Sequence, residues 1–275
     1  MKKFLLASSF ALALASGSAF AADMSPPAPM YKAPLPPVPV ANWTGCYLDA
    51  GGGYGMWNQD HFFEDAAGGT TVQTTDGGRG WLGRFGGGCD YQFPVSGLGN
   101  FVIGAFGDYD VMGLDGTVSF NTVLAHPGGA FAPLAANENE QAAWYAGARL
   151  GYLITPSVMG FVSGGWTQTR FGSLSEFFTD TGTPAGFGFA SHTYNGWFLG
   201  GGYEYALNFA WLPINGLFWK TEYRFAQYQS DNLAELNLTT GLPDGSILHS
   251  QKEVQTVTSS LVWRFNWNWP VAARY

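Results

Sequence analysis

The sequence has few charged residues, and after its first twenty residues it contains no run of 18 or more apolar residues. Only 12% of its 275 residues are charged, whereas an ordinary soluble domain has about 25%. The lack of long apolar runs argues against a helical membrane protein. The 39 glycines follow no three-residue period and there are only 15 prolines, so a collagen-like chain is excluded.

Aromatic residues and glycine are abundant instead. The chain has 22 Phe, 13 Tyr and 11 Trp, and 46% of its residues are hydrophobic. A disordered chain does not carry this much apolar surface. Glycine is about twice as frequent as the usual ~7%. This combination indicates a β-rich protein.

Residues 1–21 have the pattern of a secretory signal peptide. Lys2 and Lys3 precede an apolar run, and small residues end the segment at Ala19-Phe20-Ala21. A membrane anchor would need a longer apolar run. Removing the peptide leaves 10 of the 12 basic residues against 20 acidic ones, a net charge of −10. A chain this acidic is not expected to bind nucleic acid.

Residues 22–41 contain seven prolines and no periodic pattern, which is typical of an extended periplasmic tether. A proline-rich ligand for a partner protein is the alternative. The tether is favoured because mostly small or apolar residues flank the prolines. We expect a β-domain over residues 42–266 and a short C-terminal extension over residues 267–275.

From Trp43 onward apolar residues recur with a period of two, which indicates half-buried strands. In most of these segments one face is apolar and the other carries the charges and many of the glycines. The fifth segment is ambiguous, since Met159 and Phe161 alternate with Val162 and Trp166. The expected strands are residues 43–57, 78–93, 100–113, 142–155, 157–170, 194–206, 216–228 and 254–266.

Each expected strand is long enough to cross a bilayer at a tilt, which takes about 9–11 residues. The connections after the second, fourth and sixth strands are short, and those after the first, third, fifth and seventh are long. This alternation predicts an all-β fold: an eight-stranded antiparallel up-and-down transmembrane β-barrel with short periplasmic turns and four long extracellular loops. Closure of the barrel also removes unpaired strand edges.

Several short segments, taken in their order and spacing, resemble one family. They are the tether from Ala22-Asp23 to Tyr31-Lys32-Ala33-Pro34, Asn42-Trp43-Thr44-Gly45-Cys46-Tyr47, Gly107-Asp108-Tyr109-Asp110, Arg149-Leu150-Gly151-Tyr152 and Gly200-Gly201-Gly202-Tyr203-Glu204-Tyr205. The chain resembles the alphaproteobacterial outer-membrane β-barrel proteins called outer-membrane immunogenic or porin-family proteins. The resemblance implies an OmpA-type barrel in the outer membrane, with no catalytic residues to carry over.

The resemblance also implies partners. An outer-membrane barrel meets periplasmic chaperones, the barrel-insertion machinery, outer-membrane lipid and lipopolysaccharide. Members of the family usually end at the aromatic residue of the last strand, here Phe265, whereas this chain continues to Tyr275. The assembly signal is therefore either Trp263 with Phe265 or the terminal Tyr275. The sequence gives no oligomeric state.

The strand pattern directs eleven charged residues into the barrel. Six acids face five bases, so the lumen is nearly neutral. An eight-stranded barrel is narrow enough for its own side chains to fill it, and an unpaired ion there is costly. We therefore expect a plug of paired charges rather than a catalytic carboxylate pair. These residues are Asp49, Arg84, Asp90, Asp108, Asp110, Arg149, Glu204, Lys220, Glu222, Arg224 and Arg264.

The four histidines, His61, His126, His192 and His249, fall one in each long loop. They would hold a metal only if the loop tips converged, and no Cys, Asp or Glu lies at a tight ligand spacing from them. We expect no metal and no cofactor. A lipid-modifying enzyme would need Ser191 and His192 to cooperate, but neighbours in a strand point to opposite faces.

Cys46 begins the first expected strand and Cys89 lies near the end of the second. An antiparallel hairpin brings both to the periplasmic side on the lipid-facing phase. The periplasm is oxidising, and directly opposed residues lie within disulfide range. A disulfide and two free, packed thiols both remain open at this point.

The expected function is that of an integral outer-membrane protein with a structural or surface-exposed role, such as a surface antigen, and not an enzyme. A small porin for ions or small solutes would use the same strands but leave a water path. A soluble lipocalin-like carrier would need its apolar face inside, whereas here the charges follow the glycine-rich face.

The long loops are expected to carry nearly all of the net charge. Divalent cations could bridge these carboxylates to lipopolysaccharide, or the acids could form a solvated rim. The bases assigned to the loops are Arg79, Arg170 and Lys252. The acids assigned to them are Asp60, Glu64, Asp65, Asp76, Asp115, Glu138, Glu140, Glu176, Asp180, Asp231, Glu235, Asp244 and Glu253.

Overall fold

The computed structural model describes residues 41–125, 129, 131–207 and 216–265. Contacts divide the chain into residues 1–38 and residues 39–275, and every described residue belongs to the second unit. The expected signal peptide, the C-terminal extension and all but the last residue of the tether lie outside the described residues. Within the described ranges, no helix is long and apolar enough to span a membrane.

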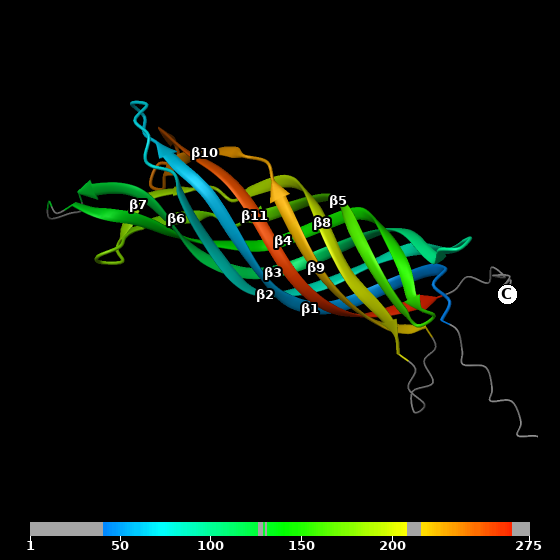
Figure 1. The fold of residues 1–275 in the computed structure, drawn as a ribbon. Helices are drawn as coiled ribbons and strands as arrows, with labels where there is room; N and C mark the ends of the chain where they lie inside the picture. Colours follow the sequence, from blue (N-terminus) through cyan, green and yellow to red (C-terminus); the bar gives the residue numbers. More distant parts are fainter. Residues whose placement is uncertain (1–40, 126–128, 130, 208–215, 266–275) are drawn as a thin grey trace, which may run out of the picture. The chain divides into compact units, whose positions relative to one another are not determined.

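The described residues form antiparallel β-strands joined mostly by short turns (Figure 1). Alternation of inward and outward side chains, as the sequence pattern predicts, runs along the long strands apart from a shift of phase in the fourth strand of the chain. The strands are β1 Gly45–Glu64, β2 Thr74–Val95, β3 Gly99–Ala125, β4 Phe131–Thr155, β5 Val158–Phe171, β6 Leu174–Phe178, β7 Pro184–Phe189, β8 His192–Ala206, β9 Leu217–Tyr228, β10 Asp231–Asn237 and β11 Pro243–Phe265.

Eight of these strands form a closed barrel, which we call the main ring: β1, β2, β3, β4, β5, β8, β9 and β11, with β11 pairing back to β1. We can start at Cys46 on β1 and step around the ring, each time to the directly paired residue of the next strand. The path returns to β1 at Met56, ten residues from its start. Such a stagger requires the strands to tilt by about 35–45° from the barrel axis. The predicted fold class is therefore confirmed.

The barrel continues beyond the main ring at one end. There β6, β7 and β10 take the places of β5, β8 and β9, so that β4 pairs with β6, β6 with β7, β7 with β10 and β10 with β11. We call this continuation the hairpin ring. Short breaks at residues 172–173, 190–191 and 229–230 separate it from the main-ring strands. Figure 1 shows β6, β7 and β10 together at the end opposite the last residues of β11.

The segments expected as four long loops are therefore largely strand in the described residues. Turns remain at residues 65–73, 179–183 and 238–242, while the tip between β3 and β4 is mostly outside the described residues. At the other end of the barrel, turns of a few residues join β2 to β3 and β4 to β5. The difference arises because the strands, once paired, keep their ladder well past the length that a bilayer requires.

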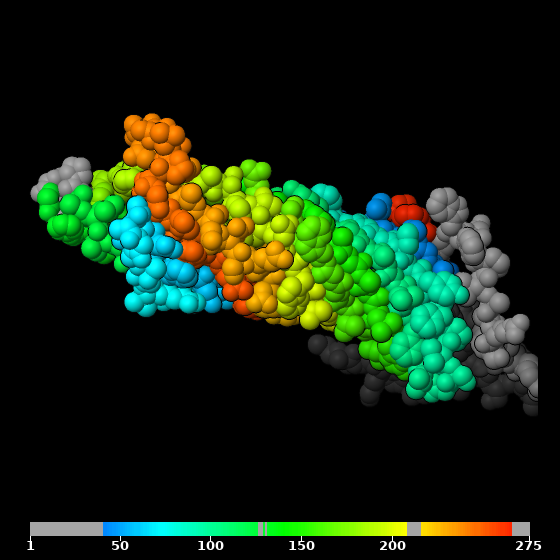
Figure 2. All heavy atoms as spheres, turned by 90° about the horizontal axis from the view of Figure 1, so that it is seen from above, coloured from blue at the N-terminus to red at the C-terminus, as the bar shows by residue number. Residues whose placement is uncertain are grey.

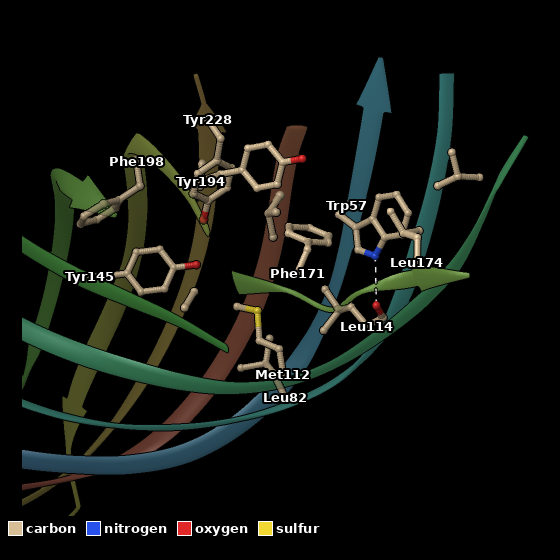
Figure 3. Close-up of a cluster of buried hydrophobic side chains, with 14 of the residues drawn as sticks. Trp57, Leu82, Met112, Leu114, Tyr145, Phe171, Leu174, Tyr194, Phe198 and Tyr228 are labelled. Atoms are coloured by element: carbon tan, nitrogen blue, oxygen red, sulfur yellow. Dashed lines mark hydrogen bonds between the residues drawn. The ribbon is translucent and has the colours of Figure 1, made fainter. Parts of the chain in front are cut away.

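The inside of the barrel holds large buried side chains along its length. Figure 3 shows the part of this core toward the hairpin ring, which we call the upper end of the barrel. Here Trp57, Phe171 and Tyr194 from three different strands point into the interior. The indole Nε1 of Trp57 donates a hydrogen bond of 3.0 Å to the carbonyl oxygen of Leu114. Toward the opposite end, Trp43 packs on Phe218 with ring centres 4.8 Å apart. Bulky rings thus fill the interior above and below the charged residues.

Glycines on the inner face make room for the charged side chains. A Cβ on Gly86 would collide with Oδ1 of Asp108, and a Cβ on Gly104 would collide with Oδ1 of Asp90. Interior glycines therefore let the carboxylates of a neighbouring strand lie flat against the barrel wall. This explains why charges and glycines share the same face in the sequence.

Candidate functional site

The outer surface of the main ring is apolar and bordered by aromatic side chains. On β2, Trp81 and Tyr91 face outward with 75% and 61% of their surfaces exposed. These residues are ten positions apart, which at about 3.3 Å per residue and a 35–45° tilt corresponds to about 25 Å along the barrel axis. That is the height of the apolar band of a transmembrane barrel. The hairpin ring projects beyond this band, on the side that carries the longer connections.

Each predicted lipid-facing and lumen-facing residue lies on the expected side of the wall. The ambiguous fifth strand is resolved: Met159 and Phe161 point inward, and Val162 and Trp166 point outward. Leu199 is 59% exposed between the aromatic residues of β8. Outward-facing positions also include Trp81, Phe85, Trp144, Leu150, Trp197, Trp219 and Phe225. All eleven predicted lumen residues are buried inside the barrel.

Four of these lumen residues form a closed ring of alternating charge, which we call the lower ionic layer. Arg149 lies 2.5 Å from Asp90 and 3.1 Å from Glu204. Arg264 lies 2.6 Å from Asp90 and 2.8 Å from Glu204. The four side chains come from β2, β4, β8 and β11, so the pairs tie together opposite walls of the barrel.

Five further residues form the upper ionic layer. Arg84 holds Asp110 with two hydrogen bonds of 2.7 and 2.6 Å and lies 3.5 Å from Glu222. Arg224 pairs with Glu222 at 2.8 Å and also with Asp108. Planar guanidinium groups suit such two-point contacts with carboxylates. Three acids and two bases thus share one network in the middle of the barrel.

Lys220 and Asp49 complete the set with an ion pair of 2.6 Å. Aromatic rings lie against these cations: the Lys220 Nζ is 5.9 Å from the ring centre of Tyr47, and the Arg224 guanidinium is 4.9 Å from that of Tyr145. Cation–π contacts add to the ion pairs among these buried side chains. The structure therefore brings all eleven predicted residues into contact with an opposite charge.

One further charged group inside the barrel was not predicted from the sequence. Lys252 is buried, and its Nζ lies 2.8 Å from Oε1 of Glu138 and 4.0 Å from the ring centre of Phe171. Glu140, also buried, accepts a hydrogen bond of 2.6 Å from Thr169. We expected Lys252, Glu138 and Glu140 in surface loops, and that expectation is wrong. The signal that points to Lys252 is the alternation of β11, which directs Lys252 to the same side as the inward-facing Thr256.

Two more acids that we expected at the surface are buried in the hairpin ring. Glu176 on β6 is 2% exposed and Glu235 on β10 is 4% exposed. Burial raises the pKa of Glu176 to about 7. Burial, together with the neighbouring Glu176 carboxyl, raises the pKa of Glu235 to about 9. The outer surface is therefore less acidic than the sequence partition implied.

Cys46 and Cys89 are directly paired residues of β1 and β2, and a disulfide joins them. Both lie on the outward-facing phase near the end of the barrel that carries the short turns. At the same end Trp263 and Phe265 face outward from the last strand, while Tyr275 lies outside the described residues.

The histidines do not gather. His61 points into the barrel, where its Nε2 lies 2.9 Å from the carbonyl oxygen of Ser119. His192 pairs with Asp231 at 2.7 Å, and His249, on the outer face, pairs with Glu64 at 2.9 Å. His126 lies outside the described residues. Within the described part of the chain, no group of three or more His, Cys, Asp or Glu side chains is arranged to hold a metal ion.

The chain is similar in sequence to two known outer-membrane proteins. No family model matches the chain. The 31 kDa outer-membrane immunogenic proteins of Brucella melitensis biotype 1 and Brucella suis biovar 1 are each 28% identical to it over 283 aligned residues. These alignments cover 96% of this chain and all of each relative.

Two solved structures show partial similarity to this fold. The outer membrane protease OmpT of Escherichia coli aligns with 80% of this chain and 97% of its own, at 10% identity and a TM-score of 0.40. Neisserial surface protein A aligns with 81% of this chain and 98% of its own, at 11% identity and a TM-score of 0.35.

The closed barrel, its apolar outer band and the whole-length similarity to the Brucella proteins agree on where the chain resides. An apolar band of this height faces lipid, and antiparallel barrels with short turns at one end are the form that crosses the outer membrane. The chain is an outer-membrane β-barrel protein, similar over nearly its whole length to the 31 kDa outer-membrane immunogenic proteins of Brucella.

Proposed function

We propose that this protein is a structural, surface-exposed component of the outer membrane whose lumen does not conduct. The observation that carries the proposal is the continuous pairing of the lumen charges in two ionic layers, with aromatic rings packed around them. A conducting path would have to hydrate these groups and separate pairs that now satisfy each other. In a barrel of eight strands there is room for side chains or for water, but not for both.

Planar-bilayer recording tests the plug directly. We expect no steady unitary current from the parent protein. Truncation of one arginine in each layer, Arg149→Ala with Arg224→Ala, removes two large side chains and leaves carboxylates unpaired, so water should enter and conductance steps should appear. The variant must still show a heat-dependent shift in electrophoretic mobility, because loss of one partner from a buried pair costs about 3–5 kcal/mol.

The matched control removes two arginines from the outer surface, Arg79→Ala with Arg170→Ala, which gives the same change in net charge. This control should stay silent. A steady unitary step from the parent that disappears on heat unfolding would support the alternative, a small porin, and would rule out the closed lumen.

We also infer that the protein has no catalytic activity on lipids. Each of the six predicted lumen carboxylates faces a base and is buried, so a substrate has no access to it. The hydroxyl of the exposed Ser191 lies 3.4 Å from Nη2 of Arg170, and His192 is paired with Asp231. Fatty-acid release from phospholipid vesicles that is abolished by Ser191→Ala would overturn this inference.

The partners that we propose follow from the location. Periplasmic chaperones and the barrel-insertion machinery would handle the unfolded chain, and Trp263 with Phe265 is our candidate for the assembly signal. These two rings are 50% and 37% exposed at the end of β11, where a partner can reach them. Lipopolysaccharide is the proposed neighbour of the hairpin ring.

A further inference from the structure

A polar groove on the outer face of the hairpin ring fits a small, hydroxyl-rich ligand. It lies where β10, β11 and the upper part of β1 run side by side, and it has a volume of about 230 Å³. In Figure 2 the light-blue and cyan residues around the end of β1 and the start of β2 lie next to the orange residues of β10 and β11. The volume is below the roughly 300–1,000 Å³ of drug-sized sites, so the groove suits a single ring-sized group.

The groove offers hydrogen-bonding groups that no other side chain uses. Among the described residues, the side-chain amides of Gln73, Asn232 and Gln251 have no hydrogen-bond partner, although all three line the groove. An amide presents donors and an acceptor next to each other, which matches vicinal hydroxyls that both donate and accept. Asp60, also on the groove wall, is already engaged through one oxygen by Thr75.

An aromatic surface lies beside these amides. Phe62 lines the groove and stacks on the His249 imidazole, with ring centres 4.3 Å apart and planes 13° from parallel. His249 is in turn fixed by Glu64 at 2.9 Å. The stack gives a firm apolar wall against which the C–H groups of a sugar ring can pack while its hydroxyls meet the amides.

The charge of the groove decides between ligand classes. Its lining includes the carboxylates of Asp60 and Asp231 and no Lys or Arg. Phosphate and carboxylate ligands need such cations, above all Arg. The carboxylates of these two residues would repel an anion and attract an ammonium group. The groove therefore favours a neutral sugar or an amino sugar over a lipid phosphate.

The height of the groove above the membrane supports the same class. On β1, Asp60 lies six residues beyond Tyr54, which stacks edge-on with Trp81 in the aromatic border of the apolar band. Six residues of tilted strand rise about 15 Å. The headgroup region adds only about 5–8 Å to each side of the hydrocarbon core. The groove thus sits beyond the phosphate layer, at the level where surface saccharides begin.

We propose that this groove binds a neutral or amino-sugar saccharide at the cell surface, through the amides of Asn232 and Gln251 and the ring of Phe62. The proposal concerns the outer face of the hairpin ring and does not depend on whether the lumen conducts.

Saturation-transfer NMR on the protein in detergent free of lipopolysaccharide tests the binding. The probes are methyl glucoside, glucosamine and inorganic phosphate. Both sugars should receive saturation and phosphate should not displace them. Asn232→Ala with Gln251→Ala should weaken sugar binding about tenfold, since each lost neutral hydrogen bond is worth about 0.5–1.5 kcal/mol.

The matched control is Asn137→Ala with Asn139→Ala, in a polar groove of β3 and β4 whose lining has no aromatic ring. This control should bind the sugars as the parent does. The proposal fails if the folded parent, checked by its heat-dependent mobility, binds neither sugar. It also fails if the control weakens binding as much as the groove variant, or if phosphate displaces the sugars.

Hydrogen exchange in liposomes separates the two possible sources of the saccharide. Protection of residues 60–62 and 249–251 by lipopolysaccharide in the bilayer would identify a lipid-linked saccharide. Protection only by added free saccharide would identify a soluble one. Protection by neither would contradict the proposal, whatever the conductance of the same preparation.

Discussion

Leu199 shows how strongly a single position on the outer face depends on its environment. Its side chain is exposed to lipid between Trp197 and Tyr203 on β8, while its strand neighbour Phe198 is buried in the lumen. Both are large and apolar, so composition alone does not separate them. The alternation of the strand does, because successive side chains leave the sheet on opposite faces.

We predict that Leu199→Arg destabilises the barrel in liposomes by about 2–4 kcal/mol, the cost of a cation near the middle of the bilayer. Folding titrations in urea would measure the change. The control Gln168→Arg on β5 lies near the upper aromatic border and beside Trp144, where an arginine can reach the interface, so it should cost about 0–1 kcal/mol. Equal stability of the Leu199 variant and the parent would mean that the strand phase is inverted.

At the residue scale, the sequence predicted the lumen charges but not their partners. The inward phase of Arg84 and Arg149 follows from alternation with the apolar residues next to them. Which acid each arginine meets depends on strand stagger: Arg149 on β4 reaches Glu204 on β8, two strands away. No local pattern in a sequence carries that information.

Strand irregularities explain the residues that were assigned to the wrong place. On β4 the ladder shifts between Glu140 and Ala142, so that inward positions change from even to odd numbers along the strand. Glu138 and Glu140 therefore point inward although a simple extrapolation from Tyr145 directs them outward. A bulge of this kind leaves no mark in a period-of-two pattern.

At the scale of whole elements, the strands β6, β7 and β10 were not predicted from the sequence. Outside the membrane both faces of a strand can meet polar surroundings, so the contrast between faces that identified the main-ring strands weakens. Segments such as residues 174–178 and 231–237 are also short. They are strands because hydrogen bonds to neighbouring strands hold them, whereas the sequence pattern alone predicted loops.

We predict that the hairpin ring loses stability as the pH rises, because of Glu176 and Glu235. Their folded-state pKa values, about 7 and about 9, lie above the ordinary value of 4.5 for glutamate. Below pH 4.5 both states are protonated and nothing is lost. As the pH rises the unfolded chain releases protons first, so stability falls progressively between about pH 5 and pH 9.

Glu176→Gln with Glu235→Gln should remove this pH dependence and stabilise the hairpin ring at pH 9 by at least about 1 kcal/mol, since one pKa unit corresponds to about 1.4 kcal/mol. Limited proteolysis of the β6–β7 turn at pH 5 and pH 9 would measure it. The control Asp180→Asn changes an exposed acid in the same turn and should leave the pH dependence unchanged. A parent with equal cleavage rates at both pH values would contradict the prediction.

The β1–β2 hairpin carries the Cys46–Cys89 disulfide on its lipid-facing side. We predict that alkylation without reductant leaves the mass of the protein unchanged, whereas reduction first adds two alkyl groups. Cys46→Ser with Cys89→Ser should lower stability by about 2–4 kcal/mol, because the bridge closes a long loop in the unfolded chain. Two alkyl groups added without reductant would show that the thiols are free.

At the scale of the whole molecule, two different interiors are joined end to end. The main ring has an apolar outside and a charged, paired inside. The inside of the hairpin ring is mainly apolar, with Phe120, Phe189 and Leu248 buried there. The lipid-facing part needs no hydrophobic core, because the membrane already supplies apolar surroundings. The part in water needs one to hold its strands together.

The last strand closes the barrel, so assembly of the whole molecule depends on it. β11 pairs with β1 over 19 residues, from Glu64↔Ile247 to Cys46↔Phe265, and a chain without this pairing has an open edge in the membrane. Trp263 and Phe265 face outward at the end of this strand, with ring centres 5.7 Å apart.

We predict that Trp263→Ala with Phe265→Ala abolishes most of the heat-modifiable, membrane-inserted form in cells, because the insertion machinery no longer reads the strand. Removal of residues 267–275 should have little effect. The control Trp219→Ala removes an aromatic ring from the outward phase of the neighbouring strand β9 and should insert normally. Refolding of the purified double variant into liposomes without the machinery should proceed nearly as for the parent, since that route depends only on strand pairing and burial. If insertion in cells instead failed on removal of residues 267–275 and survived the double substitution, Tyr275 would be the signal.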